Sequence, residues 1–309
     1  MNKTLVKLTY GLASLGLAVG SAQAQYSFTT LDHPLSIATV AYGISGNNIV
    51  GTYQTTASPD PLGFLYSGGI YTDLNVPGSV TTTPYSVSGN SVVGGYQDSS
   101  YQSRSFLYNG SSYSTLSAPQ GVNGTAALGI SGNNIVGMYY DVAGNTHGFL
   151  YNGSTYTPID DPLGVNGTVA RSISGNNIVG TYYDANWNHW DFLFNGSTFT
   201  TLNDPLAVYG TEVTGIDGND VVGYYYDANY TMNGFLYDGS TYTTIDNPLG
   251  IGGTAIEGIS GNTIVGWYQD GSYSAHGFSA TPEATPEPST LALAGLGGLG
   301  MLRQIRRRK

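Results

Sequence analysis

The chain of 309 residues is acidic, with 20 Asp and Glu against 9 Lys and Arg and a formal net charge of −11. Two basic residues lie before residue 25 and five after residue 302, so only Arg104 and Arg171 remain between them. Binding to nucleic acid or anionic lipid needs Lys or Arg to displace counterions, so this composition excludes those partners. The absence of cysteine excludes disulfides and thiol chemistry.

Residues 1–24 have the pattern of a secretory signal peptide. Lys3 and Lys7 precede an apolar stretch, and the small residues Ala22 and Ala24 form the pattern of a cleavage site. The sequence therefore predicts cleavage before Gln25 and a mature domain that spans residues 25–281.

A unit of 43 residues repeats six times through residues 25–281. The Gly of an "IVG" phrase recurs without change in spacing, at Gly51, Gly94, Gly137, Gly180, Gly223 and Gly266. The Phe of a "GFLY" phrase recurs at Phe64, Phe106, Phe149, Phe192, Phe235 and Phe278. A third phrase of the type "YTTID" also occurs six times, but the chain opens with this third phrase and closes with the second.

Each unit reads as four short strands, and their permutation indicates a closed ring. A strand that ends in "GIS" is expected innermost, followed outward by "IVGTY", "GFLY" and the "TLD" strand. Asn-Gly pairs such as Asn109-Gly110 predict type I′ hairpin turns between the outer strands. A period of 40 to 50 residues with several strands is typical of propellers. We therefore expect one all-β domain, a six-bladed β-propeller whose last blade takes its outermost strand from Phe28–Asp32.

The loops after the "IVG" strands vary most among the copies, and in a propeller they share one face with the loops that lead into each inner strand. This variation fits a binding face on a rigid scaffold, and it equally fits unconstrained drift. An aspartate recurs in five of the loops, at Asp98, Asp141, Asp184, Asp227 and Asp270. It is explained either by Asx turns that begin each loop or by weak calcium ligands.

Aromatic residues in these loops are the best candidates for ligand contact. Trp187, His189 and Trp190 crowd one loop, and Tyr230 lies in the matching loop of the next unit. Flat rings beside Asn and Asp suit sugars, because the C–H faces of a sugar pack on aromatic rings while its hydroxyls form hydrogen bonds. Packing that closes the loop is the rival explanation.

No catalytic motif is found, and the four histidines are scattered over separate copies. One position of each inner strand is expected to face the channel, and only Arg171 and Glu257 carry charge on inner strands. The six positions are Tyr42, Tyr85, Leu128, Arg171, Thr214 and Glu257. A single acid among them favours binding over catalysis and predicts no required cofactor. The alternative is a calcium-assisted hydrolase or lactonase with its site in the channel.

The C-terminal residues 282–309 form a linker followed by three elements in order. A box of Pro286, Glu287, Pro288 and Ser289 precedes twelve apolar residues, and a basic cluster with Arg306, Arg307 and Arg308 follows. The segment resembles the PEP-CTERM sorting signal of Gram-negative bacteria. That resemblance implies export, recognition by an exosortase and delivery to the cell surface or extracellular matrix. Twelve residues of helix span only about 18 Å, so we expect a transient inner-membrane anchor rather than a permanent one.

The repeat itself resembles the HAF-type extracellular repeat of bacterial secreted proteins. The resemblance rests on "IVG" followed by "GFLY" and "TLD", with His147-Gly148-Phe149 and His276-Gly277-Phe278 nearest to the defining triplet. It implies no activity. The sequence as a whole predicts an exported, non-catalytic binding or structural propeller that contacts extracellular polysaccharide.

Overall fold

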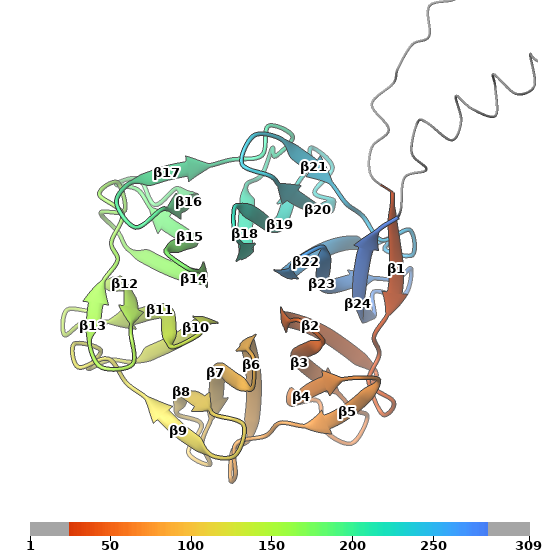
Figure 1. Cartoon of the computed structure of the whole chain (residues 1–309), viewed down its shortest axis with the longest axis horizontal. Helices are drawn as coiled ribbons and strands as arrows, with labels where there is room; N and C mark the ends of the chain where they lie inside the picture. Colours follow the sequence, from red (N-terminus) through yellow and green to blue (C-terminus); the bar gives the residue numbers. More distant parts are fainter. Residues whose placement is uncertain (1–24, 284–309) are drawn as a thin grey trace, which may run out of the picture. The chain divides into compact units, whose positions relative to one another are not determined.

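The computed structural model describes residues 25–283, and Tyr26–Pro282 form one compact unit. The unit consists of six four-stranded antiparallel sheets arranged around a common axis, as Figure 1 shows. This confirms the predicted six-bladed propeller and its strand order. Within residues 25–283 no helix is long and apolar enough to cross a membrane. The predicted signal peptide and the predicted C-terminal apolar helix lie outside the described residues.

The strands follow the order expected from the repeat, from the inside of each blade outward. Blades 1 and 2 contain β2 (Ala38–Ser45), β3 (Asn48–Gln54), β4 (Leu62–Ser67), β5 (Ile70–Asp73), β6 (Thr81–Ser88), β7 (Ser91–Gln97), β8 (Ser103–Tyr108) and β9 (Tyr113–Leu116). Blades 3 and 4 contain β10 (Thr125–Ser131), β11 (Asn134–Tyr140), β12 (Thr146–Tyr151), β13 (Tyr156–Pro158), β14 (Thr168–Ser174), β15 (Asn177–Tyr183), β16 (His189–Phe194) and β17 (Phe199–Leu202). Blades 5 and 6 contain β18 (Thr211–Asp217), β19 (Asp220–Tyr226), β20 (Met232–Tyr237), β21 (Tyr242–Thr244), β22 (Gly253–Ser260), β23 (Thr263–Gln269), β24 (Ala275–Pro282) and β1 (Tyr26–Thr30).

The ring is closed by β1, which pairs with β24 from Tyr26 opposite Pro282 to Thr30 opposite Phe278. The closing strand therefore begins and ends two residues earlier than expected. Phe28 packs against Phe278 with ring centroids 5.4 Å apart. Closure pairs a free strand from one end of the domain with the last blade, so that no blade is left with three strands.

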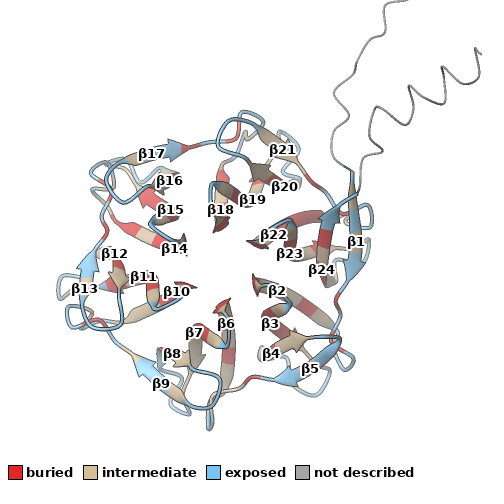
Figure 2. Ribbon diagram, in the orientation of Figure 1, coloured by how far each residue is buried: buried red, intermediate tan, exposed pale blue. Residues whose placement is uncertain are grey.

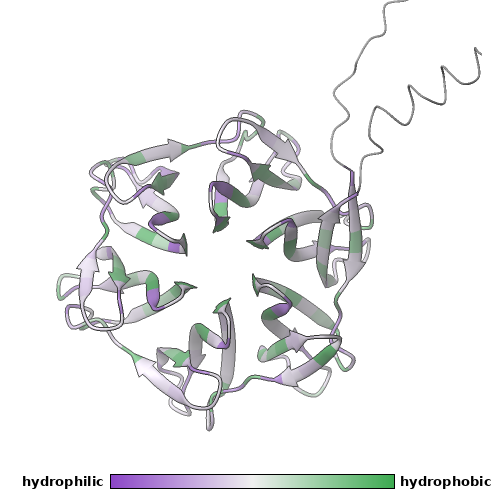
Figure 3. Cartoon of the chain, viewed as in Figure 1, coloured by the Kyte–Doolittle hydropathy of each residue, from purple (hydrophilic) through white to green (hydrophobic). Residues whose placement is uncertain are grey.

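The core lies between neighbouring blades, because each apolar cluster combines one blade with a valine of an adjacent blade. The six repeat phenylalanines are at most 1% exposed. In blade 4, for example, Ile173 and Phe192 pack with Val136 of blade 3. Figures 2 and 3 show buried and apolar residues concentrated in the inner strands, while outer strands such as β5 and β9 are exposed. Neighbouring blades are therefore held together by close-packed apolar side chains.

The invariant glycine of the "IVG" phrase allows the second strand to pass close to the first. A Cβ at Gly137 would collide with the carbonyl oxygen of Ala126 and with the ring of Phe149. Four of the other copies meet the same two obstacles, and at Gly266 the nearest atoms belong to the backbone of Ala255 and Ile256. The repeat therefore keeps glycine here because of crowding rather than because of backbone conformation.

The hairpins lie where the sequence predicts them, but the predicted type I′ turn is wrong. Gly110 has φ 91°, whereas Asn109 is not among the non-glycine residues with positive φ. Instead, the Oδ1 of Asn109 accepts hydrogen bonds from the backbone N–H groups of Ser111 and Ser112. The asparagine side chain thus replaces a backbone acceptor in a longer turn.

Candidate functional site

One face of the disc, which we call the loop face, carries two sets of loops. One set joins the second and third strands of each blade, and the other leads into the next inner strand. Hydrogen bonds connect the two sets, as from Asn166 Nδ2 to the carbonyl oxygen of Asp184 at 2.7 Å and from Asn123 Nδ2 to that of Asp141 at 2.6 Å. The predicted sharing of one face is confirmed, and the short hairpin turns lie on the opposite face.

The five recurring aspartates organise their own loops. In each loop Oδ1 accepts hydrogen bonds from the backbone N–H groups two and four residues further on, as from Asn186 and Asn188 to Asp184 at 2.8 and 2.9 Å. Asp98, Asp141, Asp227 and Asp270 repeat this pattern. The Asn188 amide and these backbone donors lower the pKa of Asp184 to about 2. The Asx-turn interpretation is confirmed, and calcium binding stays a prediction.

Four aromatic residues occupy equivalent positions at the tips of these loops. Among residues 25–283, the only non-glycine residues with positive φ are Tyr101, Trp187, Tyr230 and Tyr273, with φ between 59° and 64°. Each lies three residues after the loop aspartate, and its N–H donates to the aspartate carbonyl oxygen at 2.8–3.1 Å. The third blade has Gly144 at this place, with φ 86°. The backbone thus demands a left-handed residue, and four blades supply an aromatic one.

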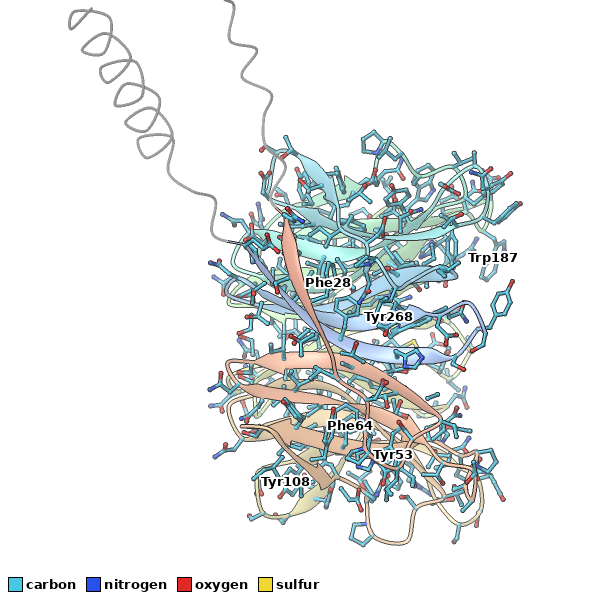
Figure 4. The ribbon with its side chains drawn as sticks, turned by 90° about the vertical axis from the view of Figure 1, so that its right-hand side faces the viewer. Phe28, Tyr53, Phe64, Tyr108, Trp187 and Tyr268 are labelled. Carbon is cyan, nitrogen blue, oxygen red and sulfur yellow. The ribbon has the colours of Figure 1, made fainter. Side chains whose placement is uncertain are left out.

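These four left-handed aromatics are also among the most exposed side chains, at 67–78%. Figure 4, in which the disc is seen from its side, shows Trp187 projecting at one face. Tyr230 is stacked on Tyr209 of the neighbouring loop, with ring centroids 3.7 Å apart and planes 13° apart. The loop face therefore presents flat aromatic surfaces to solvent.

The structure separates the four aromatic candidates named from the sequence. Trp187 and Tyr230 point into solvent, whereas Trp190 is only 37% exposed and its Nε1 donates to Asp184 Oδ2 at 3.2 Å. Trp190 also lines a groove of about 390 Å³ together with Leu163, Val165 and Asn186. His189 turns the other way, toward Asp191 and Glu212. The sequence did not single out Tyr101 and Tyr273, although their spacing from the loop aspartate matches that of Trp187.

The six inner-strand positions line the channel as expected, and each is the extra residue of a β-bulge. The registers skip Tyr42, Tyr85, Leu128, Arg171, Thr214 and Glu257. A bulge re-aims a side chain, and here all six border a cavity of about 470 Å³. Burial raises the pKa of Glu257 to about 7, although its Oε1 accepts a hydrogen bond from Trp267 Nε1 at 2.9 Å.

Beside the channel, five side chains of blades 4 and 5 form a cluster: Arg171, Thr181, His189, Asp191 and Glu212. We call it the buried polar cluster after Thr181 and Asp191, its two fully buried members. Arg171 Nη2 donates to Glu212 Oε2 at 3.1 Å, and its Nε donates to Thr181 Oγ1 at 3.2 Å. The expectation that only Arg171 and Glu257 carry charge on inner strands is wrong, because β18 begins at Thr211 and includes Glu212 and Asp217. Sequence reasoning missed the cluster because its members come from different strands of two blades.

Two other histidines each lie between two aspartates, one of which follows the end of an outer strand. His147 lies 2.9 Å from Asp160 through Nδ1 and 3.5 Å from Asp141 through Nε2. His276 joins Asp32 and Asp270 in the same way, at 2.7 and 3.4 Å. The neighbouring carboxylates raise the pKa of both imidazoles against the opposing effect of burial. Each histidine thus links the loop aspartate of its blade to the aspartate that follows the outer strand of the same blade.

Comparison with known proteins supports the sorting signal and the fold. Residues 284–308 match the PEP-CTERM protein-sorting motif, and this range includes all seven sorting residues named above. The motif indicates an exported cell-surface protein that an exosortase processes. This segment and the cleavage-site residues Ala22 and Ala24 lie outside the described residues. Comparison with characterised proteins returns no relative of similar sequence.

Several solved structures resemble the chain at low sequence identity. A fucose-specific lectin from Aleuria aurantia is 16% identical, with a TM-score of 0.50 over 82% of this chain and 98% of the lectin. A putative TolB from Agrobacterium tumefaciens is 11% identical, with a TM-score of 0.47 over 80% and 99%. A Trypanosoma rangeli sialidase is 10% identical, with a TM-score of 0.45 over 82% and 55%. At these identities the likeness concerns the fold.

Proposed function

We propose that this exported propeller is a non-catalytic binding protein whose loop face contacts neutral extracellular polysaccharide. The observation that carries the proposal is the set of four left-handed aromatics, Tyr101, Trp187, Tyr230 and Tyr273. A residue with a Cβ in the left-handed region costs about 1–2 kcal/mol relative to the usual conformations. Glycine avoids that cost, as Gly144 demonstrates in the third blade.

Four strained and solvent-exposed aromatic rings at one repeated position favour a function over packing. Packing in the core does not explain them, because each is at least two-thirds exposed, and only Tyr230 among the four is stacked closely on another ring, that of Tyr209. Strained residues concentrate at sites where ligands bind, and exposed apolar surface on one face marks an interaction site. The flat faces of such rings suit the C–H faces of sugars, and the surrounding Asn and Asp side chains can bind hydroxyls.

The charge of the domain favours an uncharged polysaccharide as the ligand. Residues 25–281 contain only Arg104 and Arg171 as basic residues, and Arg104 Nε is already bonded to Asp98 Oδ2 at 2.8 Å. Arg171 Nη2 is paired with Glu212 Oε2 at 3.1 Å. An anionic polysaccharide would therefore meet a negative face without free basic partners, and repulsion would weaken its binding.

The groove of blade 4 provides the best-defined subsite. It lies between residues 162–165 and residues 184–190, with Trp190 held in place by its hydrogen bond to Asp184. Trp187 lies on the same loop and is exposed.

The resemblance to HAF-type repeats and the transient anchoring of the tail in the inner membrane belong to this proposal as well. In it, the tail brings the propeller to the surface and the loop face holds it to the matrix.

The test is binding of the purified full chain to a neutral polysaccharide from the matrix of a producing bacterium, with an anionic polyuronate for comparison. Each measurement is made with calcium and with chelator. The variant Y101G/W187G/Y230G/Y273G removes the four aromatics. The control is I70G, which removes a side chain of equal exposure, 69%, from the start of β5, next to a hairpin turn on the opposite face.

We expect saturable binding to the neutral polysaccharide that the fourfold variant weakens at least tenfold and that I70G leaves unchanged. Binding that needs calcium would support the loop aspartates as ligands. Equal binding by the wild type and the fourfold variant, or absence of binding by both, would contradict the proposal.

A further inference from the structure

The buried polar cluster consists of residues at which one copy of the repeat departs from the others. Asp191 occupies the place of a glycine in four copies and of Ser105 in the fifth. His189 occupies the place of Thr146 and Met232, and Glu212 that of Val169 and Ala255. Three chemically distinct replacements have therefore accumulated at one spot, where β16 of blade 4 meets β18 of blade 5.

The three replacements bring one nitrogen and two oxygens together. His189 Nε2 lies 3.5 Å from Glu212 Oε1 and 3.7 Å from Asp191 Oδ1. Among residues 25–283 this is the only group of three His, Asp or Glu side chains whose ligand atoms all lie within 4.8 Å of one another. The side chain of Asp191 is completely buried.

The surrounding groups fix the two carboxylates but leave the histidine nitrogen without a partner. Thr181 Oγ1 donates to Asp191 Oδ1 and the backbone N–H of Val213 donates to Oδ2, both at 3.0 Å. Arg171 Nη2 holds Glu212 Oε2 at 3.1 Å. The buried Nε2 of His189 makes no hydrogen bond. A buried polar atom without a partner is costly and calls for an explanation.

The arrangement at His189 differs from the His–Asp pairs formed by His147 and His276. Each of those imidazoles meets its two carboxylates through different ring nitrogens. At His189 both carboxylates face the same nitrogen. A single N–H could satisfy only one of the two carboxylates, whereas a cation between the three atoms would satisfy all of them.

We infer that His189 Nε2, Asp191 Oδ1 and Glu212 Oε1 form a binding site for a divalent transition-metal ion such as Zn²⁺. Tetrahedral zinc with bonds of 2.0–2.2 Å places its ligands roughly 3.4 Å apart, close to the separations from His189. The imidazole favours zinc over calcium, which prefers oxygen ligands alone. Thr181, Val213 and Arg171 supply the outer hydrogen bonds that typically orient metal-binding carboxylates.

The surroundings of the cluster agree with this inference. A cavity of about 200 Å³, lined by His189, Asp191 and Thr211 among others, lies beside the cluster and provides room for a fourth ligand. The inference goes beyond the proposed function, because the cluster is formed by strands rather than by the left-handed loop positions.

The repeat itself supplies the variants for a test on the full chain. D191S introduces the residue of blade 2, where Ser105 Oγ accepts from the Ala127 N–H at 2.9 Å and so preserves the link between blades. H189T introduces the residue of Thr146, and E212V that of Val169. H147N is the control, because it removes a histidine that lies between two carboxylates outside the cluster.

Zinc binding is measured by equilibrium dialysis, and each variant is checked by circular dichroism and thermal unfolding. We expect one Zn²⁺ per wild-type chain, affinity reduced at least tenfold in D191S, H189T and E212V, and no change in H147N. Zinc should also raise the unfolding temperature of the wild type more than that of the three cluster variants. Failure of the wild type to bind zinc, or equal binding by every folded variant, would overturn the inference. If one variant does not fold, the other two decide.

Discussion

The left-handed aromatics make an unusual prediction about stability, namely that glycine should be better than alanine at their positions. Tyr101 and Tyr273 are the cleanest sites, because no aromatic stacking involves either ring among the described residues. Alanine keeps the Cβ that conflicts with φ near 60°, while glycine removes it. Relief of about 1–2 kcal/mol is offset by the roughly 0.5–1 kcal/mol by which glycine favours the unfolded chain.

The net difference is about 0.5–1 kcal/mol per site in favour of glycine. The two sites lie in blades 2 and 6, so their effects should add, giving about 1–2 kcal/mol for Y101G/Y273G over Y101A/Y273A. For a domain of this size each kcal/mol shifts the unfolding temperature by roughly 2–4 °C. Urea unfolding of the two double variants measures the difference. Alanine variants as stable as the glycine variants would refute the argument that strain is stored in these loops.

Three further predictions follow from the core and the channel. Because burial raises the pKa of Glu257 to about 7, the folded protein holds this proton more tightly than the unfolded chain. Its contribution to stability is therefore greatest below about pH 4.5 and falls by about 1–3 kcal/mol as the pH rises through 7. E257Q should remove that part of the pH dependence in urea unfolding, and fluorescence of Trp267 should follow the same titration. G137A should destabilise the domain by roughly 1–3 kcal/mol, because its Cβ would overlap backbone and Phe149 atoms. F28A should cost about 1–2 kcal/mol and loosen the closing strand, seen as faster amide exchange in β1 and β24.

The fold could be predicted because the same local sequence pattern occurs in all six units. The crowded glycine at Gly137 and the buried Phe149 recur in every unit, so the register of each sheet follows from the period. The permutation of phrases required the opening segment of the domain to close the ring, and the strand that does so, Tyr26–Thr30, is shifted by two residues from the predicted Phe28–Asp32. The turn type was wrong because the Asn109 side chain competes with the backbone for hydrogen bonds, which residue preference alone does not reveal.

The candidate sites were only partly predictable. Trp187 and Tyr230 stood out as loop aromatics, but their backbone conformation could have been inferred only by aligning them with Gly144. His189 was grouped with them because it is adjacent in sequence, yet strand alternation turns it inward. Its meeting with Glu212 depends on the packing of two blades, which a one-dimensional pattern does not contain.

The affinity and the stability of a single variant test the account of the loop face most directly. For the full chain carrying Y101G/W187G/Y230G/Y273G, affinity for neutral polysaccharide and the free energy of unfolding are measured together. The account predicts that affinity falls at least tenfold while stability is unchanged or higher, because the strained rings serve the ligand and not the fold. Undiminished affinity, or lost affinity accompanied by a marked loss of stability, would contradict it.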